Sequence, residues 1–395
     1  MAKPVRLNGA RVALTATHAE RIDLGIRGSR ILPFDSAPDK SIEFDLTGHL
    51  LLPGLINAHD HLEFNLFPRL GRGPYPNASN WAADIHRPDK SPVKEHLLVP
   101  KKVRLIWGGI KNLLSGVTTV AHHNPYEPFI FTDQFPVRVV NRFGWAHSLD
   151  FTPDIRGLWR RTPVRWPFIV HAAEGTDERA FSEIPRLKEL GVLDRRTILV
   201  HAVGTTPGEL ETIRRSGSSI AWCPTANLFT LGRTLAAEVL TSGVPIALGT
   251  DSALTGEGDL IDEMKCVKTV AALTPGEIYP LVTSNAARML RLNAGQGMIR
   301  ERGLADLVAV KDTGQSPAEA LVNLRPDLVI VRGRVMLMSD RFANLGRIPR
   351  SSVLRPIRVE GRGRFLIRAD VPYLHDTAAT AVGPNVRLAG KRIWP

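Results

Sequence analysis

Residues 50–61 read LLLPGLINAHDH, an apolar run that ends in two histidines one residue apart, His59 and His61. On a β-strand, side chains two positions apart point to the same face, so both imidazoles can face one metal ion. Asp60 between them points the other way. The alternative is two unrelated polar residues at the end of a strand, and so short a motif does not decide between these interpretations by itself.

Three further apolar runs also end in a side chain that can bind a metal ion or transfer a proton. They are residues 167–170 with His171 and Glu174, residues 197–200 with His201, and residues 244–250 with Asp251. Between them, residues 177–190 carry apolar side chains at helical spacing, and residues 206–209 read TPGE, which is typical of a helix start. Alternating strands and helices predict a parallel sheet, and functional residues at several strand ends are typical of a (β/α)8 barrel.

Six short segments follow one another in an order that is specific to a known family. They read PGLINAHDH (53–61), SGVTTV (115–120), HAAE (171–174), HAV (201–203), CPTAN (223–227) and LGTDS (248–252). On these segments the chain resembles the amidohydrolase superfamily over about residues 1–335. It is most similar to the mononuclear branch, which contains cytosine, guanine and adenosylhomocysteine deaminases and the triazine hydrolases. The resemblance implies an α/β protein with a (β/α)8 TIM barrel.

The resemblance also implies roles for individual residues. One divalent ion would be held by His59, His61, His171 and Asp251. His201 would lie near the metal-bound water, and Glu174 would transfer protons. Three imidazoles and a carboxylate with an open position for water suit Zn²⁺, with Fe²⁺ as the alternative. Such an ion lowers the pKa of its bound water toward ~7 and makes hydroxide available at neutral pH. We therefore expect Glu174, His201 and Asp251 to be the catalytic residues, with Asp251 accepting the proton of the water.

Two other kinds of metal site are disfavoured. A binuclear site in this superfamily usually needs a bridging carboxylated lysine on the fourth strand, and residues 112–187 contain no lysine. The cytidine-deaminase fold needs a Pro-Cys-x-x-Cys signature, which is absent. We therefore expect a hydrolase that attacks a non-peptide C–N bond with metal-bound hydroxide, with deamination of a planar, aminated N-heterocycle favoured. Opening of a cyclic amide and a catalytically silent metal-binding relative remain as alternatives.

Candidate substrate contacts also lie at or near the strand ends. They are Glu63, Trp81, His122, His123, Trp222 and Asn227. Trp222 stands where the family usually has a histidine, and we expect it either to form a flat wall of the pocket or to pack against a helix. His122 and His123 follow the second strand, where a substrate contact and a hydrogen-bonded loop are both compatible with the sequence. Trp81 lies in an unusually long loop, where a structural role fits equally well.

The chain is expected to form a barrel and a smaller module built from both termini. Residues 1–48 and 305–365 carry short strand patterns, and the resemblance implies that they combine into a β-sandwich beside a barrel of residues 49–304. About twenty residues separate the third-strand candidate, residues 137–147, from Pro167. This interval is short for a helix, a strand and a second helix, so it predicts a trimmed or irregular fourth barrel unit.

The formal net charge is +12, and residues 339–395 hold 11 Arg/Lys and 4 Asp/Glu. We interpret residues 366–395 as a basic C-terminal extension that is solvated or forms a subunit contact, which leaves a homo-oligomer open. Binding of nucleic acid is not expected, because aromatic residues are sparse in this segment and no nucleic-acid fold signature is present.

Composition agrees with a protein of a reducing compartment that acts on a small molecule. The two cysteines give no disulfide framework, and the N-terminus lacks the apolar core of a signal peptide. No run approaches the ~18 apolar residues that a membrane span requires. We therefore expect a cytoplasmic protein without a membrane contact.

Overall fold

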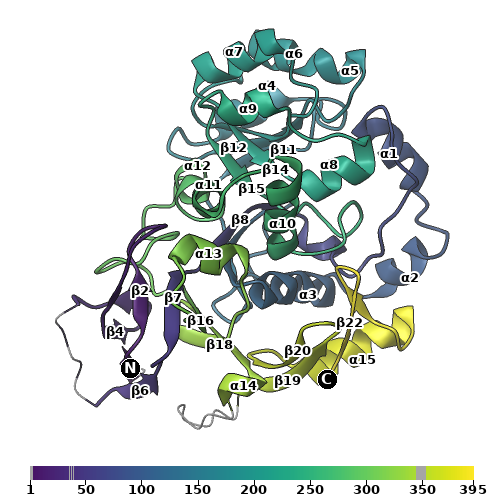
Figure 1. Ribbon diagram of the computed structural model, residues 1–395. Coiled ribbons are helices and arrows are strands. Elements are labelled where there is room, and N and C mark those ends of the chain that lie inside the picture. Colours follow the sequence, from purple (N-terminus) through teal and green to yellow (C-terminus); the bar gives the residue numbers. More distant parts are fainter. Residues whose placement is uncertain (1–2, 35, 37, 39, 344–352) are drawn as a thin grey trace.

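The computed structural model describes residues 3–34, 36, 38, 40–343 and 353–395. The upper part of the molecule in Figure 1 contains parallel strands surrounded by helices, and the lower part contains sheets built from both ends of the chain. No described helix combines the length and the apolar character that a membrane crossing requires.

Eight strand segments of the described chain form the barrel and run parallel. Three pair in the order β10-β9-β8 and five in the order β11-β12-β13-β14-β15. A parallel bridge between Asp60 and Asp251 joins the two groups. The segments are β8 (Leu55–Asp60), β9 (Val117–His122), β10 (Arg138–Val139), β11 (Gly144–Ala146), β12 (Phe168–Ala172), β13 (Thr197–His201), β14 (Ser219–Trp222) and β15 (Ile246–Leu248).

Alternate residues of each strand face different parts of the core. Ile56 and Ala58 of β8 belong to an inner apolar cluster, whereas Leu55 belongs to a larger cluster that includes the helices. Successive side chains of a strand point to opposite faces, so one set of side chains lines the barrel and the other set meets the helices. Every residue of β8, β9, β12 and β13 is buried, as parallel strands covered on both faces require.

Helices connect most of the barrel strands. α7 (Pro207–Ser216) begins with the capping box expected from the TPGE sequence, because the Thr206 side chain and the Glu209 side chain each accept the other residue's backbone N–H. The remaining elements of this part are η1 (Leu62–Phe64), α1 (Ala78–Ile85), α2 (Val93–Leu98), α3 (Lys101–Leu114), α4 (Ile155–Arg161), α5 (Glu178–Phe181), α6 (Glu183–Glu189), α8 (Pro224–Leu231), α9 (Ala237–Thr241), α10 (Leu260–Val270), α11 (Pro275–Leu281) and α12 (Ser284–Met289).

The barrel is irregular between its third and fourth strand segments. Only residues 140–143 separate β10 from β11, whereas a conventional crossover between parallel strands takes a dozen or more residues. No helix therefore follows β10, while α4 lies between β11 and β12. The predicted irregularity is present, but it lies in the second and third units, where no helix follows β9 or β10, rather than in the fourth. The barrel accordingly does not contain eight complete βα units.

Both termini contribute to the remaining sheets, as predicted. A ten-stranded sheet has the order β21-β22-β19-β20-β18-β17-β16-β7-β2-β3, and a four-stranded sheet has the order β5-β4-β1-β6. Their strands are β1 (Val5–Asn8), β2 (Arg11–Ala13), β3 (Ala19–Arg21), β4 (Leu24–Arg27), β5 (Arg30–Ile31), β6 (Ile42–Asp45), β7 (His49–Pro53), β16 (Leu307–Lys311), β17 (Leu328–Val331), β18 (Arg334–Ser339), β19 (Arg355–Val359), β20 (Gly363–Ile367), β21 (Arg387–Leu388) and β22 (Lys391–Trp394). Three helices accompany them: α13 (Pro317–Val322), α14 (Asp340–Ala343) and α15 (Val371–Val382).

The apolar run of residues 50–61 is divided between the two parts of the molecule. β7 pairs with β16 in the ten-stranded sheet, and β8 pairs with β9 in the barrel. Gly54 lies between them, and a Cβ at this position would lie 2.2 Å from the Thr118 side chain. A residue without a side chain therefore allows the chain to pass from sheet to barrel here. The first barrel strand, β8, thus begins at Leu55, and His49 lies in β7 of the ten-stranded sheet.

The C-terminal extension is part of the fold rather than a solvated tail. β19 pairs with β20 and β22. The Trp107 indole N–H of α3 donates to the carbonyl of Leu374 in α15 at 3.3 Å. Lys391 of the extension forms an ion pair with Asp262 at the start of α10 at 3.0 Å, beside the ion pair at 2.5 Å between Asp259 and Arg362, which precedes the extension. Part of the positive charge of this segment is thus neutralised by the barrel.

Candidate active site

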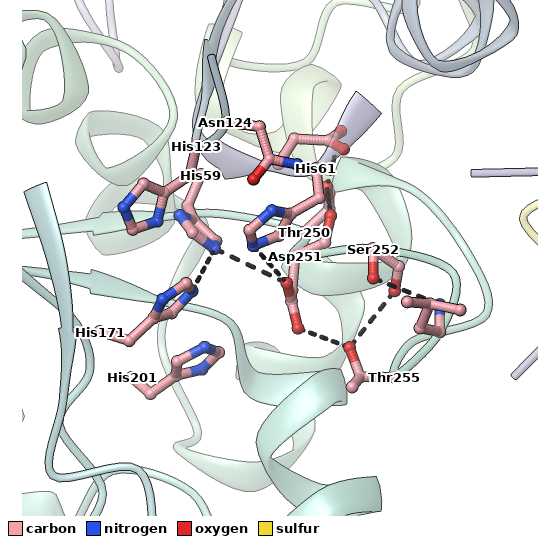
Figure 2. A network of polar contacts seen from close by, with 12 residues as sticks. His59, His61, His123, Asn124, His171, His201, Thr250, Asp251, Ser252 and Thr255 are labelled. Carbon is pink, nitrogen blue, oxygen red and sulfur yellow. Dashed lines mark hydrogen bonds and ion pairs between the residues drawn. The ribbon is translucent and has the colours of Figure 1, made fainter. Parts of the chain in front are cut away.

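The ends of the barrel strands bring a cluster of histidines and one aspartate together (Figure 2). One nitrogen from each of four buried rings, those of His59, His61, His123 and His171, lies within 4.8 Å of the others. Donor atoms of His59, His201 and Asp251 form a second such group. The predicted ligands, from β8, β12 and the segment after β15, therefore lie together, and His123 joins them from the end of β9.

The hydrogen bonds of His171 show that the cluster suits a cation. His171 Nδ1 lies 2.8 Å from the carbonyl oxygen of His147, which can only accept, so Nδ1 carries the proton and Nε2 presents a lone pair. That Nε2 lies 3.3 Å from His59 Nε2. The Asp251 Oδ1 atom lies 3.6 Å from His59 Nε2 and 3.5 Å from His61 Nε2. Neutral imidazoles facing one carboxylate are a donor set that fits a divalent metal ion.

Burial sets the protonation states of these groups. Burial, and then the neighbouring His61, lower the pKa of His59 to about 4, although the hydrogen bond to Asp251 opposes the shift. The pKa of His171 also falls well below its ordinary value, through burial and then the neighbouring histidines. Burial alone would raise the pKa of Asp251, but the hydrogen bond with His59 and the nearby His61 and His201 lower it. His59, His171 and Asp251 are therefore deprotonated at neutral pH, as metal binding requires.

Glu174 and His201 lie beside this cluster. The His201 Nδ1 atom lies 2.7 Å from Oδ1 of Asn227, and its Nε2 lies 3.5 Å from Oε1 of Glu174. Because the amide oxygen of Asn227 only accepts, His201 carries its proton on Nδ1 and presents Nε2 to the cavity. Burial, and then the charge of Asp251, raises the pKa of Glu174 well above its ordinary value. Glu174 is thus suited to donate a proton.

A cavity of about 710 Å³ opens above the cluster, and His61, His171, Glu174, His201 and Asp251 all line it. One wall is apolar and comes from the loop and helices after β8: Phe64, Phe67, Leu70, Trp81, Ile85 and Leu97. Polar side chains that line it include Glu63, Asn124, His147 and Asp150. A cavity with a polar floor and an apolar wall suits a flat molecule with a hydrogen-bonding edge.

The candidate substrate contacts divide into residues that reach the cavity and residues that support others. Glu63 and Trp81 line the cavity. His122 does not, because its Nδ1 accepts the Leu62 N–H at 3.2 Å and its Nε2 faces Glu63 at 3.4 Å. Asn227 supports His201. His147 directly follows β11 and lines the cavity, but it was not among the predicted site residues. The rule that a polar residue after a strand marks the site could have identified it.

Trp222 does not contact the cavity, and the prediction of a stacking wall is not supported. Its side chain is fully buried, and its indole N–H donates to Thr234 Oγ1 at 2.6 Å. Its neighbours Ala221 and Cys223 belong to the inner cluster, whereas Trp222 belongs to the outer one. The two-residue period of the strand therefore turns the indole toward the helices, which was the alternative interpretation.

A buried polar network supports the strand ends from behind. Asp60 points away from the histidine cluster, as expected, and its Oδ2 lies 3.0 Å from Nζ of Lys111 in α3. Asn112 of α3 also donates to Asp60, at 2.8 Å. Lys111 Nζ lies 3.0 Å from Thr250 Oγ1, which precedes Asp251. One lysine thus connects the strand end that carries His59 and His61 with the one that carries Asp251.

Backbone strain is concentrated at the same strand ends. Ala173, His201, Ala202 and Asp251 have φ values of 51°, 73°, 54° and 52°. Non-glycine residues seldom adopt this left-handed conformation, and strain of this kind is common at functional sites. At three strand ends the chain turns sharply beside a proposed functional side chain.

The parallel barrel and its histidine–aspartate cluster define a metal-dependent hydrolase. A model of the "Amidohydrolase family" matches residues 165–336. A 5-methylthioadenosine/S-adenosylhomocysteine deaminase of Pyrococcus horikoshii is 30% identical over 406 residues, covering 84% of this chain and 94% of that protein. The chain belongs to the amidohydrolase family. The prediction of a hydrolase that acts on C–N bonds other than peptide bonds is therefore confirmed.

Two further proteins are similar. A 5'-deoxyadenosine deaminase of Methanothrix thermoacetophila is 25% identical over 355 residues, covering 77% of this chain and 84% of that protein. The crystal structure of an adenosine deaminase from Xanthomonas campestris with bound zinc superposes with a TM-score of 0.71 at 17% identity. It covers 95% of this chain and 97% of the other, which shows a common fold.

Proposed function

We propose that this chain is a deaminase of adenine-containing nucleosides, which replaces the exocyclic amino group of the base by oxygen and releases ammonia. The observation that carries the proposal is the buried histidine–aspartate cluster on the floor of a cavity that Glu174 and His201 also line. The named activities of two relatives support an adenine nucleoside as the substrate. All predicted ligands lie together, which disfavours a silent relative.

His59, His61, His171 and Asp251 would hold one divalent ion, with Zn²⁺ favoured because it suits imidazole and carboxylate donors, and Fe²⁺ as the alternative. When bound, the ion supplies a water molecule of lowered pKa as the nucleophile. Thr255 donates to Asp251 Oδ2 at 2.5 Å and so fixes the orientation of this carboxylate. Asp251 then accepts a proton from the attacking water.

Glu174 would supply the proton that the base needs. Its raised pKa keeps the carboxyl protonated, so that it can protonate the ring nitrogen beside the amino-bearing carbon. The proton held by Asp251 passes to the amino group, which leaves as ammonia. The hydroxyl left on the carbon returns its proton to Glu174, and the product carries a C=O group and a protonated ring nitrogen. His201, oriented by Asn227, would accept a hydrogen bond from the attacking water at Nε2.

Glu63 would contact the sugar. Its Oε1 accepts a hydrogen bond from Asn124 at 2.7 Å, and His122 Nε2 lies 3.4 Å from its Oε2. Asn124 thus holds this carboxylate at the cavity wall, and its oxygens can accept the hydroxyl donors of a ribose. Trp81 and Phe64 provide apolar surface for the flat base or for an apolar substituent.

A substrate panel tests the proposal. The metal-loaded protein is incubated with 5'-deoxyadenosine, 5-methylthioadenosine, S-adenosylhomocysteine, adenosine, an aminotriazine and a cyclic amide. Released ammonia and the ultraviolet shift from adenine to hypoxanthine are recorded. We expect turnover of one or more adenine nucleosides and much slower turnover of the others. Ammonia from the triazine alone, or ring opening without ammonia, would replace the proposal by another hydrolase activity.

A further inference from the structure

His123 belongs to the histidine cluster by position, although the family resemblance assigns it no role. It directly follows β9 and is 1% exposed. Its ring centroid lies 5.0 Å from that of His59 and 4.5 Å from that of His171. One of its nitrogens lies within 4.8 Å of a nitrogen of each of the other three rings. Figure 2 shows the His123 ring beside His59 and on the same side of the cluster as His171.

The hydrogen bonds of His123 determine which nitrogen is free. Nε2 lies 3.0 Å from the carbonyl oxygen of Ala146. A carbonyl accepts only, so Nε2 carries the proton and Nδ1 has a lone pair. Nδ1 is buried and has no hydrogen-bond partner among the described residues. A buried acceptor without a partner is unfavourable, so the position requires an explanation.

The neighbouring His122 provides the contrast. Its Nδ1 accepts the Leu62 N–H, and its Nε2, which makes no hydrogen bond to a described residue, lies 3.4 Å from Glu63 Oε2. The lone pair of His122 is therefore used by Leu62, whereas the lone pair of His123 is unused and its ring lies beside the three predicted histidine ligands.

We propose that His123 is a further ligand of the divalent ion, through Nδ1. The inference rests on the proposed metal site. The Nε2–H bond to Ala146 fixes the ring and its tautomer, as the bonds of His171 to His147 and of His201 to Asn227 do for those rings. Four imidazoles and Asp251 give five protein donors. This number exceeds the usual three protein ligands of a catalytic zinc site and favours an ion that accepts five or six ligands, such as Fe²⁺ or Co²⁺.

Two substitutions separate metal binding from the hydrogen bond to Ala146. His123→Gln keeps an N–H donor for the Ala146 carbonyl but removes the imidazole nitrogen. His123→Phe removes both. His122→Asn is the matched control, because His122 is equally buried and adjacent but its ring faces Glu63. Affinity for Co²⁺ and Zn²⁺ is measured by competition with a chromophoric chelator, and circular dichroism checks the fold of each metal-free variant.

We expect both His123 variants to lose more than ~100-fold in metal affinity, beyond the ~10–100-fold effect of groups that only support ligands. The His122 control should change by less than tenfold. Weakening in His123→Phe alone would assign the effect to the Ala146 hydrogen bond and overturn the proposal. Unchanged affinity in both variants would overturn it as well.

A second measurement uses the unaltered protein and does not depend on the folding of a variant. X-ray absorption of the Co²⁺-loaded chain counts imidazoles bound to the ion, and the intensity of the visible Co²⁺ bands distinguishes four-coordinate from higher-coordinate ions. We expect four imidazoles bound to Co²⁺ and weak visible bands in the unaltered protein, and three bound imidazoles in His123→Gln. Three imidazoles and strong bands contradict the proposal. If the protein turns over adenine nucleosides but only three imidazoles bind the ion, this inference alone is overturned. If four imidazoles bind the ion but no adenine nucleoside is turned over, only the deaminase assignment is overturned.

Discussion

Three histidines of the candidate site, His123, His171 and His201, each use one ring nitrogen to bond an oxygen that can only accept. These oxygens are the carbonyls of His147 and Ala146 and the side-chain amide of Asn227. At the scale of single residues, such partners fix the tautomer and leave the other nitrogen of each ring facing the cluster. The chemistry of the site therefore depends on groups that never touch a substrate.

Glu174→Gln tests the proposed proton donor. The substitution keeps the size and a hydrogen-bonding group but cannot exchange a proton. We expect the metal content to stay the same and turnover to fall by ~10²-fold or more, as is typical when a positioned acid is removed. Steady-state kinetics and elemental analysis measure the two quantities. Full activity on the true substrate would assign the proton transfer to another group.

Asn227 offers a paired test of how His201 is oriented. Asn227→Leu removes the acceptor for His201 Nδ1, and we expect kcat to fall by ~10–100-fold, as when other outer partners of such histidines are lost. Asn227→Asp keeps an acceptor oxygen and should retain most of the activity. Comparing kcat and KM of the two variants is the measurement. Equal kcat values for both variants would contradict an orienting role.

At the scale of elements, α3 connects two strand ends that carry site residues. Lys111 and Asp60 are 4% and 0% exposed, and they form an ion pair at 3.0 Å. Breaking one partner of a buried pair leaves the other charge without compensation, whereas replacing both is often much less harmful. This contrast makes the pair testable by a double-mutant cycle.

We expect Lys111→Met to lower the free energy of unfolding by about 3–5 kcal/mol, because Asp60 then keeps a buried negative charge. The double variant Lys111→Met with Asp60→Asn should recover a large part of that loss. Urea unfolding of the metal-free proteins measures both values. A double variant as unstable as the sum of the two single variants would show that the residues do not interact.

The buried carboxyl of Glu263 in α10 makes the stability of the protein depend on pH. Burial raises the pKa of this carboxyl to about 8, although hydrogen bonds from Thr225 at the start of α8 oppose the shift. In the unfolded chain its pKa is the ordinary 4.5. Its contribution to stability is fully present below pH 4.5 and is lost as pH rises to about 8, because only the unfolded state ionises in this window.

Glu263→Gln cannot ionise, and its amide oxygen can accept the Thr225 N–H while its amide N–H donates to Thr225 Oγ1. We therefore expect the variant to gain stability over the native protein between pH 5 and pH 8, by up to ~1.4 kcal/mol per pH unit. Urea unfolding of the metal-free proteins at these two pH values measures the difference. The same difference at both pH values would show that Glu263 is ionised in the folded protein.

At the scale of the whole molecule, the proposed ligands come from β8, β12 and the segment after β15, which are far apart in sequence. An ion bound by all of them stabilises only the folded chain. At a free metal concentration of 1,000 times Kd, this stabilisation is about 4 kcal/mol.

We expect about one tightly bound ion per chain, because the donors converge on a single cluster. Removing it with a chelator should lower Tm, and adding Zn²⁺ or Fe²⁺ back should restore it. Elemental analysis and calorimetry measure the two effects. Two tightly held ions per chain would overturn the mononuclear assignment, and an unchanged Tm would show that the cluster does not hold an ion in the folded state.

The sequence alone determined which strand ends carry the site. A strand has a two-residue period, and the carboxyl ends of parallel strands meet on one face of a barrel, so the spacing of His59 and His61 and the positions of His171 and Asp251 predicted one cluster. The capping box of α7 is equally local, because its two bonds join residues three apart. The joining of both termini was implied by the family resemblance and is present in the structure.

Only the tertiary structure decided the features that depend on contacts between distant residues. Trp222 faces the helices because its strand neighbours fill the barrel, and residues 366–395 are ordered because they pair with β19 and pack on α3. The different surroundings of His122 and His123 were equally hidden, since they are set by Leu62, Glu63 and Ala146. The direction of a side chain relative to a curved barrel, and the partner of each ring nitrogen, are properties of the packed molecule and not of local sequence.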